Sequence, residues 1–292
     1  GKLIACLEKL LLPRCKKKPG RELLAGFVLV AVTLLACGLV PYLVFRGLSL
    51  LHPCLGRVFY LYLAFILLAG RSLSREAKGV YRALQEGTLA DAQQAVGRIV
   101  GRDTSSLSRE GVMKAAVETV AENVNDGIVA PLFYLALFGP LGMCVYKGIN
   151  TMDSMVGYKS EKYLYFGRAA ARLDDIAGFL PARLSAFLIM AACPFCGFSA
   201  KRAFQIFLRD RYQHESPNSA QGESTMAGAL GIRLGGPASY FGKLKEKPYL
   251  GDDLRPPKAE DILSAVRIMW VSEALAVLLL AGVSLVLWGF GR

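Results

Sequence analysis

The sequence predicts an all-α integral membrane protein, and three observations support this fold class. Of the 292 residues, 53% are hydrophobic and only 20% are charged, and the mean hydropathy is +0.38, which is more apolar than an ordinary soluble domain. The apolar residues are gathered in long blocks, and basic residues stand directly before the first block. We therefore expect three to five membrane-embedded helical blocks, some broken or re-entrant, joined by cytoplasmic helical loops.

Two apolar blocks are long enough to cross a bilayer. Residues 22–45 carry no charge after Glu22, and residues 268–290 carry only Glu273. Because about 20 apolar residues span the hydrocarbon core as a helix, both blocks are predicted to be transmembrane helices.

Three further apolar blocks contain charged or helix-breaking residues. They are residues 48–70 with His52, Pro53 and Arg57, residues 127–146 with Gly139-Pro140, and residues 176–197 with Pro181 and Arg183. Each block is expected either to cross the membrane or to form a broken or re-entrant helix, because irregular backbone survives at membrane depth where protein or a wet cavity satisfies it. We favour a break at Gly139-Pro140.

The N-terminal segment is strongly basic. It carries Lys2, Lys9, Arg14, Lys16, Lys17, Lys18 and Arg21 against Glu8 alone. By the positive-inside tendency, the N-terminus is expected on the cytoplasmic side of the cell membrane. The formal net charge of +12 fits membrane orientation and anionic small ligands, and no nucleic-acid-binding motif is present.

Residues 71–114 form a polar helical insert within what we expect to be one membrane-embedded domain, residues 1–292. Residues 74–87 have the pattern of an amphipathic helix closed by Gly87, and Thr88 with Asp91 has the spacing of a capping box. The serines that follow are placed to cap a next helix that carries Glu118. A second polar stretch, residues 198–261, is expected to be a loop region.

The helix after the insert carries a polar stripe. At about 100° per residue, Glu118 and Glu122 lie about 40° apart, Asn125 returns close to Glu118, Lys114 lies one turn earlier and Asp126 lies at the edge. Two interpretations remain open, a solvated face or ion pair with Lys114, and a site for Mg²⁺ or a substrate amine. With two histidines in the chain, chemistry must rely on carboxylates, amides, hydroxyls, lysine and arginine.

A second group of charges lies in residues 146–186. If residues 167–177 are helical, Arg168, Arg172 and Asp175 share a face. Arg183 lies about three turns after Arg172 and would share that face if Pro181 does not kink the helix. It also lies inside an apolar block, where an arginine usually pairs with a carboxylate, here Asp175 or Asp153, or with a ligand phosphate.

A glycine-rich segment, residues 214–242, forms the third unusual region. Gly228, Gly231, Gly235 and Gly236 permit close backbone approach, as a phosphate or nucleotide requires, although no Walker A motif is present. A plain flexible loop has a similar composition.

These three regions together resemble one family. They are "AAVETVAENVNDGIVAPLFY" at 115–134, "YKGINTMDSMVGYKSEKYLYFGRAAARLDDIAGFLPARLSA" at 146–186 and "SPNSAQGESTMAGALGIRLGG" at 216–236, preceded by "IVGRDTSSLS" at 99–108. Their order and spacing resemble those of the adenosylcobinamide-phosphate synthases of cobalamin biosynthesis, the CbiB/CobD family, over roughly residues 1–250. The sequence departs from the family at Glu215, where members often have proline, and at Gly222-Glu223, where they commonly have Pro-Glu.

The resemblance implies an ATP-dependent amide ligase. It would join a propionate carboxylate of adenosylcobyric acid to (R)-1-aminopropan-2-ol phosphate, with ATP and Mg²⁺ as cofactors. Membrane lipid is a further expected partner, other corrinoid-pathway proteins are candidates, and nucleic acid is not expected. The alternatives are a Mg²⁺-dependent membrane prenyl or phosphoalcohol transferase and a membrane transporter.

Candidate site residues follow from these motifs and the implied reaction. The catalytic candidates are Glu118, Glu122, Asp126, Asp153, Asp174 and Asp175, of which Glu118, Glu122 and Asp126 are candidate Mg²⁺ ligands. The substrate-binding candidates are Asn123, Asn125, Lys147, Asn150, Lys159, Arg172, Arg183, Asn218, Glu223 and Arg233. Carboxylates would hold Mg²⁺ or the amine, Asp174 or Asp175 would accept the amine proton, and lysines and arginines would hold phosphates.

Overall fold

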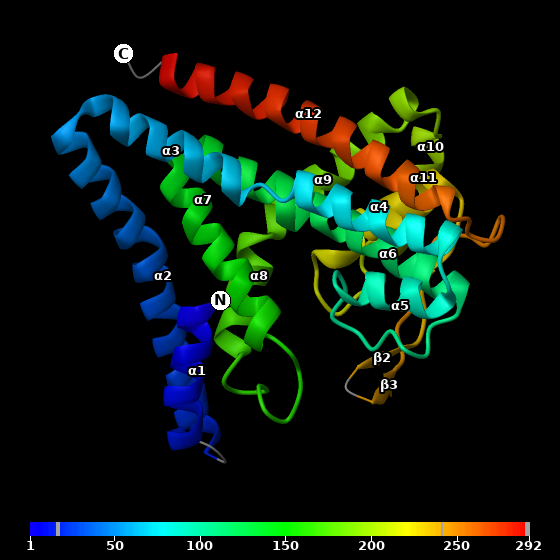
Figure 1. Ribbon diagram of the computed structural model, residues 1–292, viewed down its shortest axis with the longest axis horizontal. Coiled ribbons are helices and arrows are strands. Elements are labelled where there is room, and N and C mark those ends of the chain that lie inside the picture. Colours follow the sequence, from blue (N-terminus) through cyan, green and yellow to red (C-terminus); the bar gives the residue numbers. More distant parts are fainter. Residues whose placement is uncertain (16–17, 241, 290–292) are drawn as a thin grey trace. The chain divides into compact units, whose positions relative to one another are not determined.

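The computed structural model describes residues 1–15, 18–240 and 242–289, and most of them are helical (Figure 1). The chain groups into two compact units, which we call unit 1 (residues 1–68 and 130–178) and unit 2 (residues 69–129 and 179–292). Two of the predicted N-terminal basic residues, Lys16 and Lys17, lie outside the described residues, as does residue 290 at the end of the last predicted block.

Unit 1 consists of helices. They are α1 (Lys2–Cys15), α2 (Pro19–Leu51), α3 (Pro53–Leu67), α7 (Ala130–Val156) and α8 (Arg168–Ala177). Unit 2 contains α4 (Gly70–Glu86), α5 (Leu89–Gly97), α6 (Arg109–Val124), a π-helical turn η1 (Asn125–Val129), α9 (Phe179–Ala192), a 3₁₀ turn η2 (Pro194–Cys196), α10 (Ala200–Asp210), α11 (Ser219–Leu230) and α12 (Glu260–Gly289). Its short strands are β1 (Leu234–Gly235), β2 (Ala238–Tyr240), β3 (Lys243–Lys245) and β4 (Tyr249–Leu250).

The helices confirm the predicted class, an all-α multi-pass membrane protein. Among the described residues, four helical stretches are long and apolar enough to cross a membrane, namely Pro19–Leu51, Pro53–Glu86, Arg109–Val156 and Glu260–Val286, and the bent pair α8 and α9 would make a fifth. The first predicted transmembrane block falls within α2, and the described part of the second, residues 268–289, falls within α12. Large apolar side chains remain exposed along these helices, for example Leu35 and Leu61, as expected for surfaces that face lipid.

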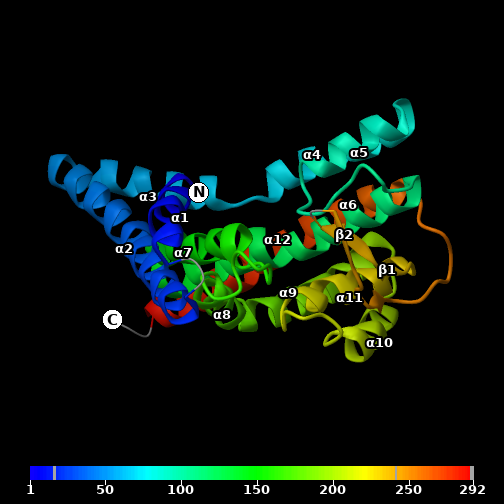
Figure 2. The same ribbon diagram turned by 90° about the horizontal axis from the view of Figure 1, so that it is seen from below.

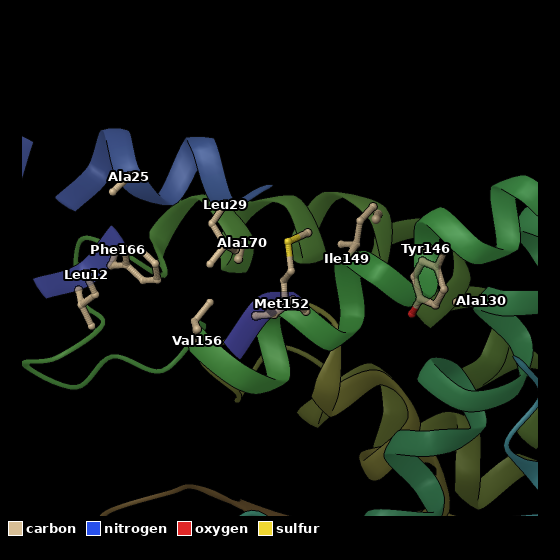
Figure 3. Packing of buried hydrophobic residues seen from close by; sticks show 12 residues of the cluster. Leu12, Ala25, Leu29, Ala130, Tyr146, Ile149, Met152, Val156, Phe166 and Ala170 are labelled. Atoms are coloured by element: carbon tan, nitrogen blue, oxygen red, sulfur yellow. The ribbon is translucent and has the colours of Figure 1, made fainter. Parts of the chain in front are cut away.

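An apolar cluster holds unit 1 together. Figure 3 shows Leu29 of α2, Ala170 of α8 and Met152 and Val156 of α7 gathered in this cluster, all of them buried. Gly26 allows α2 to approach closely, because an added Cβ there would collide with the carbonyl oxygen of Phe166. The long apolar helices of unit 1 are thus held by packing and small residues.

Helix α7 is broken where the sequence predicts a break. Gly139 has φ 68° and ψ −168° and interrupts the helical backbone directly before Pro140. Glycine adopts this left-handed φ without the steric cost that a Cβ brings. The predicted break at Gly139-Pro140 is therefore confirmed, while the side of the membrane on which each half lies stays a prediction.

The predicted helix ends of the polar insert are also confirmed. Gly87 closes α4, and Thr88 and Asp91 form a reciprocal capping box at the start of α5. The Ser108 hydroxyl accepts a hydrogen bond from the Gly111 N–H and caps α6, the helix that carries Glu118. These caps satisfy first-turn N–H groups and therefore set where the helices begin.

Residues 198–261, expected to be a loop region, contain more structure than their composition indicates. Helices α10 and α11 lie side by side (Figure 2), and two small antiparallel pairs form, β1 with β4 and β2 with β3. The physical reason lies in small residues. An added Cβ at Gly222 would lie 2.8 Å from the carbonyl oxygen of Ala121 in α6, and one at Gly228 would lie 2.8 Å from Ile206 Cβ in α10. Close packing therefore stabilises a helix that has few large side chains.

Candidate active site

The candidate site lies where α6 and α11 cross in unit 2. The close contact between Gly222 and Ala121 brings the next residue of each helix, Glu223 and Glu122, into one region. Glu118 lies one turn before Glu122 on α6. The crossing therefore gathers three carboxylates that come from two of the sequence motifs described above.

Glu118 is held by contacts with two other segments. Its Oε2 lies 2.8 Å from Arg102 Nη2, and its Oε1 accepts a hydrogen bond of 2.7 Å from the Gly235 N–H. Both side chains of the ion pair are mostly buried, with 10% of Arg102 and 15% of Glu118 exposed. An ion pair of Glu118 with Lys114, one of the two interpretations of the stripe, is not formed, since Lys114 pairs with Glu110 at 2.6 Å.

Glu223 is the electrostatically unusual member of the cluster. Burial raises the pKa of its carboxyl well above the usual range, and the negative charges of Glu122 and Glu118 raise it further, whereas Lys247 and Arg102 lower it. The side chain keeps partial exposure, and Glu122 is exposed. A reachable carboxyl with a raised pKa is a stronger base than an ordinary carboxylate and is suited to proton transfer.

The predicted metal ligands are not assembled into one ligand set by the protein. In the part of the chain that the structure describes, no group of three His, Cys, Asp or Glu side chains could hold a metal ion. Asp126 lies in the π-helical turn η1 and accepts a hydrogen bond of 2.6 Å from Asn125 Nδ2. This turn interrupts the α-helical spacing on which the stripe was based, so Asp126 does not continue it. The carboxylates still have the oxygen donors that Mg²⁺ prefers, and this ion is commonly held by one or two of them together with substrate phosphates.

Arg183 has neutral partners where a carboxylate partner was expected. It donates to the Phe179 carbonyl at 2.7 Å and to Asn218 Oδ1 at 3.2 Å, and its guanidinium stacks 3.5 Å from the centre of the Phe179 ring. The predicted pair with Asp175 or Asp153 would join the two units and stays a prediction. The chain breaks at Gly178, so Arg183 belongs to α9 of unit 2 and does not continue the α8 face that carries Arg172.

Other predicted residues of unit 2 have local roles. Asn123 Nδ2 donates to the Thr119 carbonyl at 2.9 Å. Arg233 forms an ion pair of 2.9 Å with Asp253 and lies over the Tyr249 ring. Gly235 and Gly236 have φ 73° and 89°, and the groups close to them belong to the paired strand β4 and the residue before it. These glycines serve the packing of the chain itself.

The remaining predicted residues lie in unit 1. They are Asp153, Asp174, Asp175, Lys147, Asn150, Lys159 and Arg172. The predicted common face of α8 is confirmed for one pair, since Arg172 Nη1 lies 4.0 Å from Asp175 Oδ2. The structure thus brings Glu118, Glu122 and Glu223 together in unit 2 and pairs Arg172 with Asp175 in unit 1.

Sequence reasoning missed the cations of the site. Arg102 pairs with Glu118, and the charge of Lys247 acts on Glu223. The neighbouring Asp103 anchors the same loop, because its Oδ2 accepts hydrogen bonds of 2.8 Å from the Ser239 hydroxyl and from the Gly242 N–H. One signal was available, an Arg-Asp pair in a hydroxyl-rich loop directly before the glutamate-bearing helix. No local signal points to Lys247.

Comparisons with known proteins agree with these motifs. The family described as CobD/Cbib protein matches residues 1–269. The cobalamin biosynthesis protein CobD of Klebsiella pneumoniae is 47% identical over 284 residues, which cover 97% of this chain and 88% of that protein. CobD of Pelobacter propionicus is 46% identical over 286 residues, with 98% and 87% covered. The cobalamin biosynthesis protein CbiB of Salmonella typhi is 45% identical over 280 residues, with 96% and 87% covered.

No solved structure matches this chain, so its assignment rests on the sequence relationship. The family match covers the carboxylate cluster, the loop that carries Arg102, and the helices of both units up to the first part of α12. On this coverage and these identities, the chain belongs to the CobD/Cbib protein family.

Proposed function

We propose that this protein acts in cobalamin biosynthesis as an ATP-dependent amide ligase, forming adenosylcobinamide phosphate from adenosylcobyric acid and (R)-1-aminopropan-2-ol phosphate. The relatives named as cobalamin biosynthesis proteins support the pathway. The observation that carries the reaction type is the cluster of Glu223, Glu122 and Glu118 beside Arg102 and Lys247, in which the Glu223 pKa is raised.

Amide formation requires an activated carboxyl group and a neutral amine. In the proposed reaction the propionate oxygen attacks the terminal phosphorus of ATP, the bond from that phosphorus to ADP breaks, and an acyl phosphate forms. The amine nitrogen then attacks the acyl carbon, the carbon–oxygen bond to phosphate breaks, and the amine loses a proton. Positive charge near the phosphoryl group and a base near the amine would lower the barriers.

The carboxylate cluster fits the amine half of this reaction. A substrate ammonium would bind beside Glu122, which is exposed, and its positive charge would offset the repulsion between the carboxylates. Glu223 would take the proton that the nitrogen loses, since a carboxylate with a raised pKa is a stronger base than an ordinary one. Arg102 and the Gly235 N–H would keep Glu118 in place.

Mg²⁺ fits the donor types of the same cluster. Glu122 would hold it together with substrate phosphates, which leaves Glu223 to act as the base, and the ion would supply positive charge for the phosphoryl group when bound.

A direct assay tests the proposal. The protein purified in detergent is incubated with adenosylcobyric acid, ATP, Mg²⁺ and aminopropanol phosphate, and the corrinoid product is followed by mass spectrometry. We expect amide product from the wild type and from the control Glu86→Gln, which replaces an exposed carboxylate of α4. Glu223→Gln should form the product at a rate that is lower by about 100-fold or more. No product from the wild type would overturn the ligase, and full activity in a folded Glu223→Gln variant would overturn the role of Glu223.

A further inference from the structure

Unit 2 contains two arginines beside the start of α11 that have no carboxylate partner. Arg183 lies one turn into α9, and Arg211 directly follows α10. Among the described residues of unit 2, neither side chain forms an ion pair with an aspartate or a glutamate, and the hydrogen-bond acceptors of Arg183 are neutral. Arginine is normally paired when it is not fully solvated, so two such residues together point to an anion that is not part of the chain.

Arg211 is held by stacking. Its guanidinium lies 5.0 Å from the centre of the Phe207 ring and 4.7 Å from that of Tyr212. Its Nε is buried and has no hydrogen-bond partner, although a buried N–H usually has one. The stacking orients the planar donor group without using its donors, as a ready-made site for an anion requires.

A shared set of hydrogen bonds links the two arginines. Arg183 Nη2 donates to the Pro217 carbonyl at 3.4 Å, and Gln221 Nε2 donates to the same carbonyl at 3.0 Å and to the Arg211 carbonyl at 3.2 Å. Gln221 is fully buried. The side-chain amide of Gln221 therefore keeps both arginines close to Pro217. At this short distance their like charges repel each other.

Nearby carboxylates are engaged elsewhere. Asp210 binds Arg209 and accepts a hydrogen bond from the Gly251 N–H, and Glu215 pairs with Lys245. The arginine pair is thus left with a local excess of positive charge.

The start of α11 adds to this field. Asn218 occupies the N-cap position but makes no side-chain capping hydrogen bond, and its Oδ1 accepts from Arg183 instead. The N–H groups of a first helical turn and the helix dipole favour an anion at this end. The helix that begins here also carries Glu223, so the two arginines and the carboxylate cluster are connected through one rigid element.

We propose that Arg183 and Arg211, together with the first turn of α11, bind a phosphate group of a small-molecule substrate. This inference rests on the proposed function for its two candidate sources, the phosphate of the amino alcohol and the phosphates of ATP. Arg183 and Asn218 were expected from the sequence to bind substrate, whereas Arg211 was not.

Binding to the purified protein tests this proposal without requiring catalysis. Inorganic phosphate and aminopropanol phosphate are titrated by calorimetry into the wild type, Arg211→Gln and Lys201→Gln, the last of which removes one charge from an exposed position of α10. We expect Arg211→Gln to weaken binding of aminopropanol phosphate about 10- to 100-fold, since a hydrogen bond to a charged group contributes about 1.5–3 kcal/mol. Lys201→Gln should bind as the wild type does, and Arg211→Lys should restore only part of the affinity because it lacks the planar fork.

Two further measurements distinguish the source of the phosphate and protect the test against misfolding. A larger KM for aminopropanol phosphate with an unchanged KM for ATP assigns the amino alcohol, and the reverse assigns the nucleotide. Unphosphorylated aminopropanol should bind the wild type and Arg211→Gln equally if the amine phosphate occupies the site. Wild-type affinities for phosphate, aminopropanol phosphate and ATP in folded Arg183→Gln and Arg211→Gln variants would overturn the proposal, even if no amide product forms and the ligase proposal fails as well.

Discussion

Units 1 and 2 use two different kinds of stabilisation. In unit 1 the apolar cluster around Leu29, Met152 and Phe166 joins the helices, and the ion pair of Lys162 with Glu8 leaves 56% of the lysine side chain exposed. In unit 2 the ion pair of Arg102 with Glu118 is mostly buried and receives a further hydrogen bond from the Gly235 N–H. Unit 1 is built like a lipid-facing bundle, and unit 2 contains a network of fixed charges.

This difference indicates where charge can be used for chemistry. A charge in water is screened and costs little to rearrange, whereas a desolvated charge acts strongly on its neighbours. In unit 2, burial and the charges of carboxylates from a separate helix together raise the pKa of one described carboxyl group, that of Glu223. The following substitutions test the comparison.

The largest expected effect is the loss of stability on breaking the buried ion pair of unit 2, compared with the exposed ion pair of unit 1. Arg102→Met leaves Glu118 mostly buried without its cation, which costs about 3 kcal/mol of unfolding free energy. Lys162→Met removes an exposed partner of Glu8 and costs about 1 kcal/mol or less. Thermal unfolding in detergent, followed by circular dichroism, compares the two variants, and equal losses would contradict the distinction between the units.

A smaller loss is expected from crowding at the helix crossing of unit 2. Gly222→Ala places a methyl group 2.8 Å from the Ala121 carbonyl oxygen, so α6 and α11 must separate, at a cost of about 1–3 kcal/mol. Gly47→Ala is the matched control in unit 1, because nothing lies within 4 Å of its added Cβ. It should be neutral or slightly stabilising. The same unfolding assay applies, and a Gly222→Ala variant as stable as Gly47→Ala would show that the crossing is not tightly packed.

The pH dependence of stability tests the environment of Glu223. Its pKa is raised in the folded protein above the ordinary 4.5, so the folded state holds the proton more tightly than the unfolded chain does. The carboxyl therefore favours folding fully below its ordinary pKa and loses this contribution as the pH rises through the folded-state pKa. Glu223→Gln, which stays neutral, should gain a few degrees in unfolding midpoint relative to the wild type as the pH rises above the ordinary carboxyl pKa. A difference that does not change with pH, measured beside Glu86→Gln, would contradict the raised pKa.

The smallest effect is expected at the break in α7. Gly139 has φ 68° and nothing lies within 4 Å of an added Cβ, so Gly139→Ala has only the conformational cost of a left-handed residue, about 1 kcal/mol. Gly38→Ala, at a position in α2 where the added Cβ makes an ordinary contact of 3.7 Å, should be neutral or stabilising. A higher midpoint for Gly139→Ala than for the wild type would mean that the helix prefers to be continuous there.

Local sequence patterns predicted the features that depend on neighbouring residues. The capping box of Thr88 and Asp91, the Ser108 cap and the break at Gly139 were all predicted correctly, because each arises from groups within a few positions of one another. Such patterns do not settle the partners of Arg183 and Lys114. Their partners depend on where a helix breaks and on which of several carboxylates comes closest.

The sequence by itself determined the class of protein, the family and the carboxylates that are candidates for catalysis. The length of the apolar blocks, the helix caps and the long motifs each depend on residues that are close together in the sequence. Only the tertiary structure decided which charges meet. Gly235 reaches Glu118 across 117 positions, Glu223 lies beside Glu122 because glycine lets two helices touch, and Gln221 holds Arg211 near Arg183. Helical periodicity orders side chains within one helix, whereas contacts between helices depend on packing that no local pattern encodes.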